Sequence, residues 1–215
     1  MTLENIITTG LVAQWVIMII LIILSIVLTR SFKEVPEGKQ NVAEAFVELI
    51  AGLVEDNMGK EYIGFVPFIG TLFLFLLCLN LVGLVGIKPP TSDYSVALGL
   101  GLVSFLVVQG YTIKKVGIIH YFLGFAQPYA FLLPLNILER ISFPISLSLR
   151  LFGNMFAATI IMDLLYEALR HVGAVVQFGI PIPLHAYFDV FDGSLQMVIF
   201  IMLTMINIKL IAEHD

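Results

Sequence analysis

Long apolar runs, separated by short polar segments, dominate the pattern along this chain. Residues 11–29, 63–87 and 95–112 carry no charged side chain. A helix needs about 20 mostly apolar residues to cross the hydrocarbon core of a bilayer, and each run is close to that length. The pattern therefore predicts three membrane spans, near 11–29, 63–87 and 95–112.

The second half of the chain is apolar too, but its runs contain ionisable residues. One helical stretch is expected near 135–170 and a last span near 190–211. At 1.5 Å per residue, 139–170 would be about 48 Å long, whereas a hydrocarbon core is about 30 Å thick. That helix must be steeply tilted or bent, and Pro144 and Gly153 offer places to bend. We expect an all-α integral membrane protein, with about five transmembrane helices in one membrane domain over 1–215.

Residues 41–58 have a different pattern, with apolar positions at helical spacing and three glutamates, Glu44, Glu48 and Glu55. Such a segment is typical of an amphipathic helix lying at the membrane interface. An unusually polar start to the next span is the alternative interpretation.

The composition supports a membrane protein and excludes several kinds of chemical site. Hydrophobic residues make up 59% of the chain and charged residues 13%, against about 25% charged in soluble domains. Lipid is therefore an expected partner. Nucleic acid is not expected as a partner, because the chain has no basic stripe. Cys78 is the single cysteine, which excludes an internal disulfide, and no metal or cofactor site is expected. No nucleotide-binding motif is present, so this chain is expected to perform no ATP chemistry itself.

Basic residues predict the orientation. Arg30, Lys33, Lys39 and Lys60 follow the first span, and Lys114 and Lys115 follow the third, whereas the second connection has Lys88. Because cytoplasmic loops carry an excess of lysine and arginine, the N-terminus is expected outside and the C-terminus in the cytoplasm.

Arg150 is the most informative residue, because it is the only ionisable side chain within 141–162. An arginine at the centre of a span costs at least ~2.5–3.5 kcal/mol on insertion scales. Guanidinium groups do not lose their proton in proteins, so this charge asks for a partner. No acid lies within one helical turn of it. Either Arg150 is a snorkelling or structurally paired arginine, or another molecule supplies the anion.

A helical projection gives the long helix two polar faces. Ser146, Asn154 and Glu139 lie on the side of Arg150, whereas Thr159 and Asp163 lie near the opposite side.

On the last span Asp189, Asp192 and Gln196 are expected to share one face. Acids and amides inside lipid are typical of an ion path, although acids at the ends of spans can also be wetted by headgroups. We interpret His185 as an interfacial residue rather than a metal ligand.

The segment SLSLRLFGNM, residues 146–155, resembles the signature of the a subunit of F-type ATP synthases, the stator subunit of the F0 sector, in its bacterial form. PFIGTLFLFLLCLNLVGL (67–84), the turn at 89–93 and LQMVIF (195–200) resemble further landmarks of that family. The resemblance covers most of the chain.

The resemblance implies that Arg150 faces a ring of c subunits, whose membrane carboxylates supply the missing anion. Two offset half-channels would pass H⁺ or Na⁺ to and from the ring, and so couple ion flow to rotation and ATP synthesis. Other implied partners are the b subunits of the peripheral stalk and the rest of the F1F0 complex, in a bacterial plasma membrane. The resemblance also places Gln196 near the arginine, Glu139 near the cytoplasmic opening, and Asn154, Ser146 and Asn80 along the channels.

Two positions depart from the family pattern. Thr159 stands where many relatives have glutamate. Asp189 stands where relatives have histidine or glutamate. The resemblance then implies that Asp189 and Asp163 supply the acids of the outer half-channel. Neither the coupling ion nor the number of c subunits follows from this chain.

Two other functions are compatible with the residues alone. A free-standing secondary transporter or channel would use Arg150 to bind an anion, and would show an enclosed pocket and an internal repeat, which we do not find. A structural anchor leaves Arg150 unexplained. A rotor partner instead predicts a shallow face of small residues around Arg150: Ser146, Gly153 and Ala157.

Overall fold

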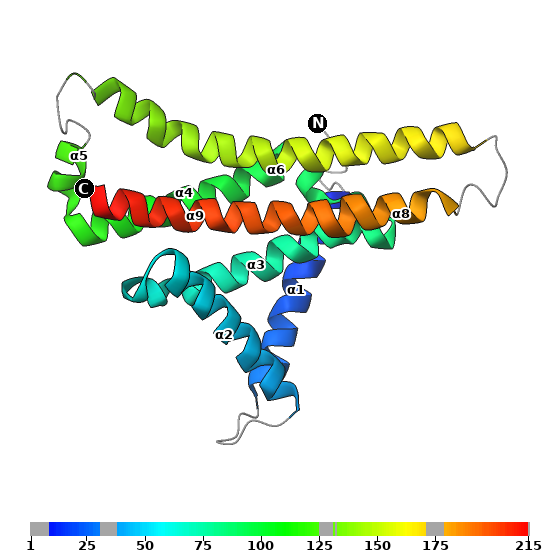
Figure 1. Cartoon of the computed structure of the whole chain (residues 1–215), viewed down its shortest axis with the longest axis horizontal. Helices are drawn as coiled ribbons and strands as arrows, with labels where there is room; N and C mark the ends of the chain where they lie inside the picture. The colour runs from blue at the N-terminus through cyan, green and yellow to red at the C-terminus, as the bar shows by residue number, and fades with distance from the viewer. Residues whose placement is uncertain (1–8, 31–37, 125–130, 132, 171–178, 215) are drawn as a thin grey trace.

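The computed structural model describes residues 9–30, 38–124, 131, 133–170 and 179–214, and its described residues form helices, turns and bends without a strand (Figure 1). Five helical runs in this part of the chain are long and apolar enough to cross a membrane. They are Gly10–Thr29, Lys60–Val85, Tyr94–Val116, Leu133–Leu169 and Pro181–Ile211. The predicted fold class, an all-α integral membrane protein, is confirmed.

Helix α1 (Thr9–Thr29) leaves its apolar side chains exposed, as a lipid-facing span does. Helix α2 (Lys39–Asn57) packs against α3 (Val66–Leu81). Its buried residues Ile50 and Val54 are four positions apart, which is the spacing of one face of an amphipathic helix. Gly59, with φ of 107°, follows the end of α2. The segment expected near 41–58 is therefore a separate helix and not the start of a span.

The connection between α3 and α4 (Tyr94–Val116) is a compact turn. A 3₁₀ segment, Val82–Val85, extends α3 and ends at Gly86, whose φ of 77° suits glycine. A second 3₁₀ turn, Pro90–Ser92, leads to Asp93, whose carboxylate accepts a hydrogen bond from the backbone N–H of Ser95 at 2.9 Å. Asp93 thus caps the first turn of α4.

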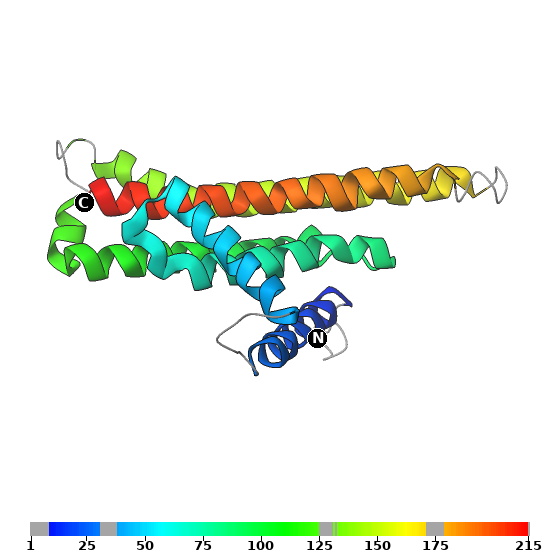
Figure 2. The same cartoon turned by 60° about the horizontal axis from the view of Figure 1, so that its bottom comes forward.

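Helix α6 (Leu133–Leu169) and helix α9 (Gly193–His214) run antiparallel, side by side, over the layer formed by α3 and α4 (Figure 1, Figure 2). The 37 residues of α6 extend about 56 Å, and the helix continues through Pro144. A Cβ on Gly101 of α4 would lie 2.8 Å from the backbone oxygen of Pro144, so the two helices touch there. In Figure 1 the α6–α9 pair crosses the direction of α1 steeply.

The last membrane run begins well before the expected residue 190. Short helix α8 (Pro181–His185) is followed by a π-helical segment, Ala186–Asp192, and then directly by α9. In a π-helix each hydrogen bond spans five residues instead of four, so side chains take different directions from those of an α-helix. Such segments are frequent at functional sites.

Candidate functional site

A pocket of about 340 Å³ lies between the C-terminal half of α6, the turn after α3 and the π-helical segment. Its polar side chains are Lys88, Thr159, Asp163, Tyr166, His185 and Asp189. Three residues predicted for the ion path, Thr159, Asp163 and Asp189, are therefore brought together from two helices. Met155, Ala158 and Met162 add an apolar wall.

Asp189 is the most buried acid of this pocket. Its side chain is 7% exposed, and its Oδ2 lies 2.5 Å from Nδ1 of His185, one helical turn earlier. The other ring nitrogen of His185, Nε2, lies 2.8 Å from the hydroxyl of Tyr166 on α6. The π-helical segment thus carries an acid that is tied through a histidine to the neighbouring helix.

Gly83 makes room for the Asp189 carboxylate. A Cβ added at Gly83 would lie 2.6 Å from Oδ1 and Cγ of Asp189, closer than real Cβ contacts come. Any larger residue at this position would therefore displace Asp189 or the 3₁₀ turn that carries Gly83.

Asn80 lies in a buried network that joins three segments. Its Nδ2 donates to the backbone oxygen of Gly193 at 2.8 Å, and its Oδ1 accepts from the hydroxyl of Thr91 at 2.9 Å. Both side chains are fully buried. Asn80 does not line the pocket; it holds α3, the turn before α4 and the start of α9 together. The channel-lining role that the resemblance implies stays a prediction.

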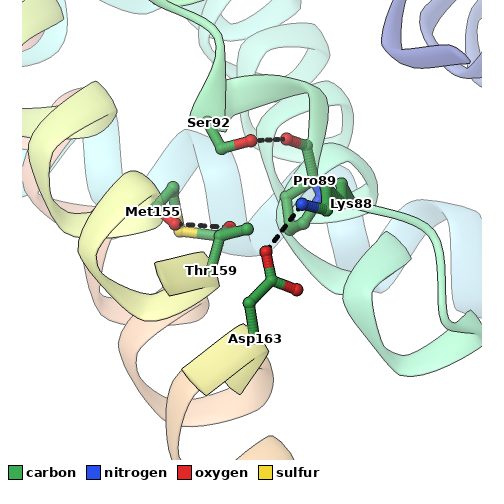
Figure 3. A network of polar contacts seen from close by, with 6 residues as sticks. All are labelled: Lys88, Pro89, Ser92, Met155, Thr159 and Asp163. Carbon is green, nitrogen blue, oxygen red and sulfur yellow. Dashed lines mark hydrogen bonds and ion pairs between the residues drawn. The ribbon is translucent and has the colours of Figure 1, made fainter. Parts of the chain in front are cut away.

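At the rim of the pocket, Lys88 reaches from the turn to α6 (Figure 3). Its Nζ donates to Oδ2 of Asp163 at 2.7 Å, and both side chains are more than half exposed. The hydroxyl of Thr159 donates to the backbone oxygen of Met155 at 2.8 Å. Its oxygen still has a lone pair with which to accept a bond or coordinate a cation.

Arg150 lies on the other side of α6, and its side chain is exposed. Within the part of the chain that the structure describes, it makes no hydrogen bond and no ion pair. The small residues Ser146, Gly153 and Ala157 are exposed on the same helix, as is Glu139, and Asn154 is half-buried. Leu151, Met155 and Ala158 face the bundle instead.

The two remaining predicted site residues differ in burial. Gln196 of α9 is 5% exposed, whereas Asp192 is half-exposed and does not line the pocket. The prediction that Asp192 shares the face of Asp189 assumed an α-helix, and this spacing does not hold inside a π-helical segment. No group of three or more His, Cys, Asp or Glu side chains within the described residues is arranged to hold a metal ion.

Sequence reasoning missed three members of the pocket: Lys88, Tyr166 and His185. The bond between His185 and Asp189 has a readable signal, because residues four apart on a helix are neighbours. The bonds of Lys88 to Asp163 and of Tyr166 to His185 join residues 75 and 19 positions apart, so no local spacing predicts them.

These features define a class: a helical multi-pass membrane protein in which one long helix carries an exposed arginine on one side and a pocket with acids on the other. Ionisable residues inside membrane segments typically mark ion pathways. The family model described as the ATP synthase A chain matches residues 11–209, and the chain belongs to this family.

Relatives cover nearly the whole chain. It is 38% identical to ATP synthase subunit a of Moorella thermoacetica over 194 residues. This match covers 90% of this chain and 85% of that relative. It is 34% identical to the sodium ion specific ATP synthase subunit a of Propionigenium modestum, over 94% of this chain and 73% of that protein. The chloroplastic ATP synthase subunit a of Stigeoclonium helveticum is 33% identical, over 88% of this chain and 78% of that protein. The resemblance seen in the sequence is confirmed, and with it membership of the F1F0 complex.

Proposed function

We propose that this chain forms two offset half-channels that pass ions to and from the carboxylates of a c-subunit ring, with Arg150 between them. The observation that supports this most directly is the exposure of Arg150. It lies midway along a membrane helix, and no described residue pairs with it. A permanent charge in that position is stable only if an anion meets it, and a passing rotor carboxylate provides one.

Electrostatics explains what Arg150 would do. At about 4 Å and an effective dielectric of ~20, the attraction between guanidinium and carboxylate is about 4 kcal/mol. This favours the ionised carboxylate, so the ion bound to it is released as it passes Arg150. The same fixed charge repels a cation that tries to cross directly from one half-channel to the other.

The pocket beside Asp189 would form the outer half-channel. With the N-terminus outside and five spans, α6 runs outward, so Thr159 and Asp163 lie toward the outer side and Glu139 toward the cytoplasm. Glu139 lies about 16 Å from Arg150 along the helix axis, and Thr159 about 14 Å in the other direction. The two openings are therefore offset along one helix. Asn154, Ser146 and Gln196 would line the path between them.

The length and direction of α6 support a place against the ring. At about 56 Å it fits a ~30 Å hydrocarbon core only when it lies far from the membrane normal. If α1 stands along the normal, the crossing seen in Figure 1 gives the α6–α9 pair that steep tilt. The exposed small residues Ser146, Gly153 and Ala157 would allow close approach of the ring helices. The b subunits of the peripheral stalk and a bacterial plasma membrane complete the proposed setting.

Replacement of Arg150 tests the proposal. We expect Arg150→Ala to lower ion-driven ATP synthesis by at least about 100-fold in liposomes that hold the intact complex, because an interaction of about 4 kcal/mol is lost. Arg170→Ala is the matched control, since Arg170 is exposed at the end of α6 and paired with Glu167. If Arg150→Ala couples at the wild-type rate, with equal recovery of the complex, the proposal is wrong. The alternative function, an anion-binding transporter, would then explain Arg150 better.

A further inference from the structure

A continuous line of hydrogen-bonding groups leads from the surface of the pocket to its buried acid. Tyr166 contacts His185 Nε2 at 2.8 Å, and His185 Nδ1 contacts Asp189 Oδ2 at 2.5 Å. Both ring nitrogens of one histidine are thus engaged, one on each side. Since an ionised carboxylate only accepts, Nδ1 is the donor to Asp189, and Nε2 is then free to accept from the Tyr166 hydroxyl.

Exposure falls steadily along this line. Tyr166 is 46% exposed, whereas the side chains of His185 and Asp189 are 26% and 7% exposed. The tyrosine end therefore opens to the outside of the protein, and the histidine separates it from the acid. Such a gradient is what a proton needs in order to move from an aqueous opening to a group inside the protein.

The titratable groups around His185 come from every element of the pocket. Asp189 lies on the π-helical segment that follows His185, Tyr166 and Asp163 lie on α6, and Lys88 lies on the turn after α3. The ammonium of Lys88 is held by Asp163 at 2.7 Å, so its charge is neutralised locally. Asp189 is then the acid that bonds to the imidazole directly.

We propose that His185 relays protons from the pocket to Asp189, so that the ion entering by this route is H⁺. This inference rests on the function proposed above for the pocket. The Tyr166 hydroxyl gives its proton to Nε2 while its oxygen takes one from water, and Nδ1 gives its proton to the Asp189 carboxylate. One proton has entered and one has moved on, which leaves His185 neutral with its proton on Nε2. Asp189 passes its proton toward the rotor carboxylate. The half-buried His185 ring regains its starting tautomer by releasing the Nε2 proton to water and taking up a proton from water at Nδ1.

A sodium ion does not fit this line. Na⁺ needs several oxygen ligands, whereas the bond between His185 and Asp189 is too short to admit an ion between the two atoms. A proton, in contrast, moves along hydrogen bonds that already exist. The same contact that excludes the metal ion therefore serves the proton.

The decisive variant is His185→Asn in the intact complex in liposomes. The asparagine Nδ2 occupies the place of the imidazole Nδ1 and still donates to Asp189, but an amide does not relay a proton. We expect proton-driven ATP synthesis, and passive proton uptake through F0, to fall about 100-fold, as for loss of a general acid–base group. His120→Asn is the matched control, because His120 is an exposed histidine on α5 (Ile118–Gly124), outside the pocket, and should keep wild-type rates.

Imidazole rescue separates a relay from a structural contact within one preparation. His185→Ala leaves space beside the 340 Å³ pocket for free imidazole. We expect added imidazoles to restore proton uptake, and the restored rate to follow the basicity of the substituted imidazole used. A merely structural role predicts no such dependence on basicity.

Two results would overturn the relay. One is wild-type proton uptake in His185→Asn; the other is ATP synthesis by the wild-type complex that is driven by a sodium gradient and resists protonophores. Both leave the half-channel proposal standing, provided that Arg150→Ala still abolishes coupling. Coupling retained in Arg150→Ala would instead remove the function on which the relay rests.

Discussion

On one side of α6, Arg150 is exposed and makes no polar contact with any described residue, whereas on the other side Asp163 is bonded to Lys88 at 2.7 Å. Asp189 faces that second side too and is bonded to His185. Both regions put charges at membrane depth, where charge is costly. They differ in whether the compensating group belongs to this chain.

This difference shows how an unpaired charge can indicate a partner. In the pocket the turn after α3, α6 and the π-helical segment satisfy one another, so the region is complete without another subunit. Arg150 has no such partner among the described residues, and in the proposed function an external anion supplies it. The same helix therefore offers a closed polar site on one side and an open one on the other, and this division is consistent with the proposed ion path that meets a rotor.

The largest effect on the pocket side of α6 is expected when its buried acid, Asp189, is neutralised. We expect Asp189→Asn to slow ion entry from the outer side by about 100-fold or more, because the amide neither binds nor passes on a proton. The matched variant is Asp192→Asn, on the same π-helical segment but outside the pocket, with less than about a twofold effect. Ion uptake through F0 into liposomes measures both. Equal rates in the two variants would remove Asp189 from the path.

A smaller effect is expected when the acid is displaced rather than removed. In Gly83→Ala the new methyl group would meet the Asp189 carboxylate at 2.6 Å, so one of them must move. Overpacking of this kind costs about 1–3 kcal/mol, and we expect a lower Tm together with slower ion uptake. Gly110→Ala in α4 meets no atom within 4 Å and serves as the control. Unchanged uptake in Gly83→Ala would show that the position of Asp189 is not critical.

The smallest effect tests why Asp163 is needed. We expect Asp163→Asn to slow uptake a few-fold, because Lys88 would then stand unpaired at the rim and repel incoming cations. The double variant Lys88→Gln/Asp163→Asn should recover most of the rate, and the defect of the single variant should shrink at high salt, since exposed charges are screened. A double variant as slow as the single one would make Asp163 a carrier of ions instead.

The fold class was predictable from the sequence, because length and hydrophobicity of spans are local properties. The isolation of Arg150 could be read in the same way, from the absence of an acid within one turn. The two sides of α6 follow from helical projection, since α6 is a regular helix from Leu133 to Leu169.

What could not be predicted depends on irregular backbone and on contacts between distant segments. The π-helical segment Ala186–Asp192 changes the direction of side chains, so an α-helical projection paired Asp192 with Asp189 although only Asp189 lines the pocket. Tyr166 meets His185 only because α6 and α8 are packed together. Neither the polar line to Asp189 nor the space left by Gly83 has a signal in local hydrophobicity.

Disulfide cross-linking tests most directly whether the open side of α6 meets the rotor. Ala157 and Ala158 are neighbours, but Ala157 is exposed and Ala158 is 6% exposed and faces the bundle. In a Cys78→Ser background, each is changed to cysteine and paired with a cysteine beside the membrane carboxylate of the c subunit, in the intact complex. We predict a cross-link from Ala157→Cys and none from Ala158→Cys. A cross-link from Ala158→Cys alone, or from neither variant in a coupled complex, would contradict the account.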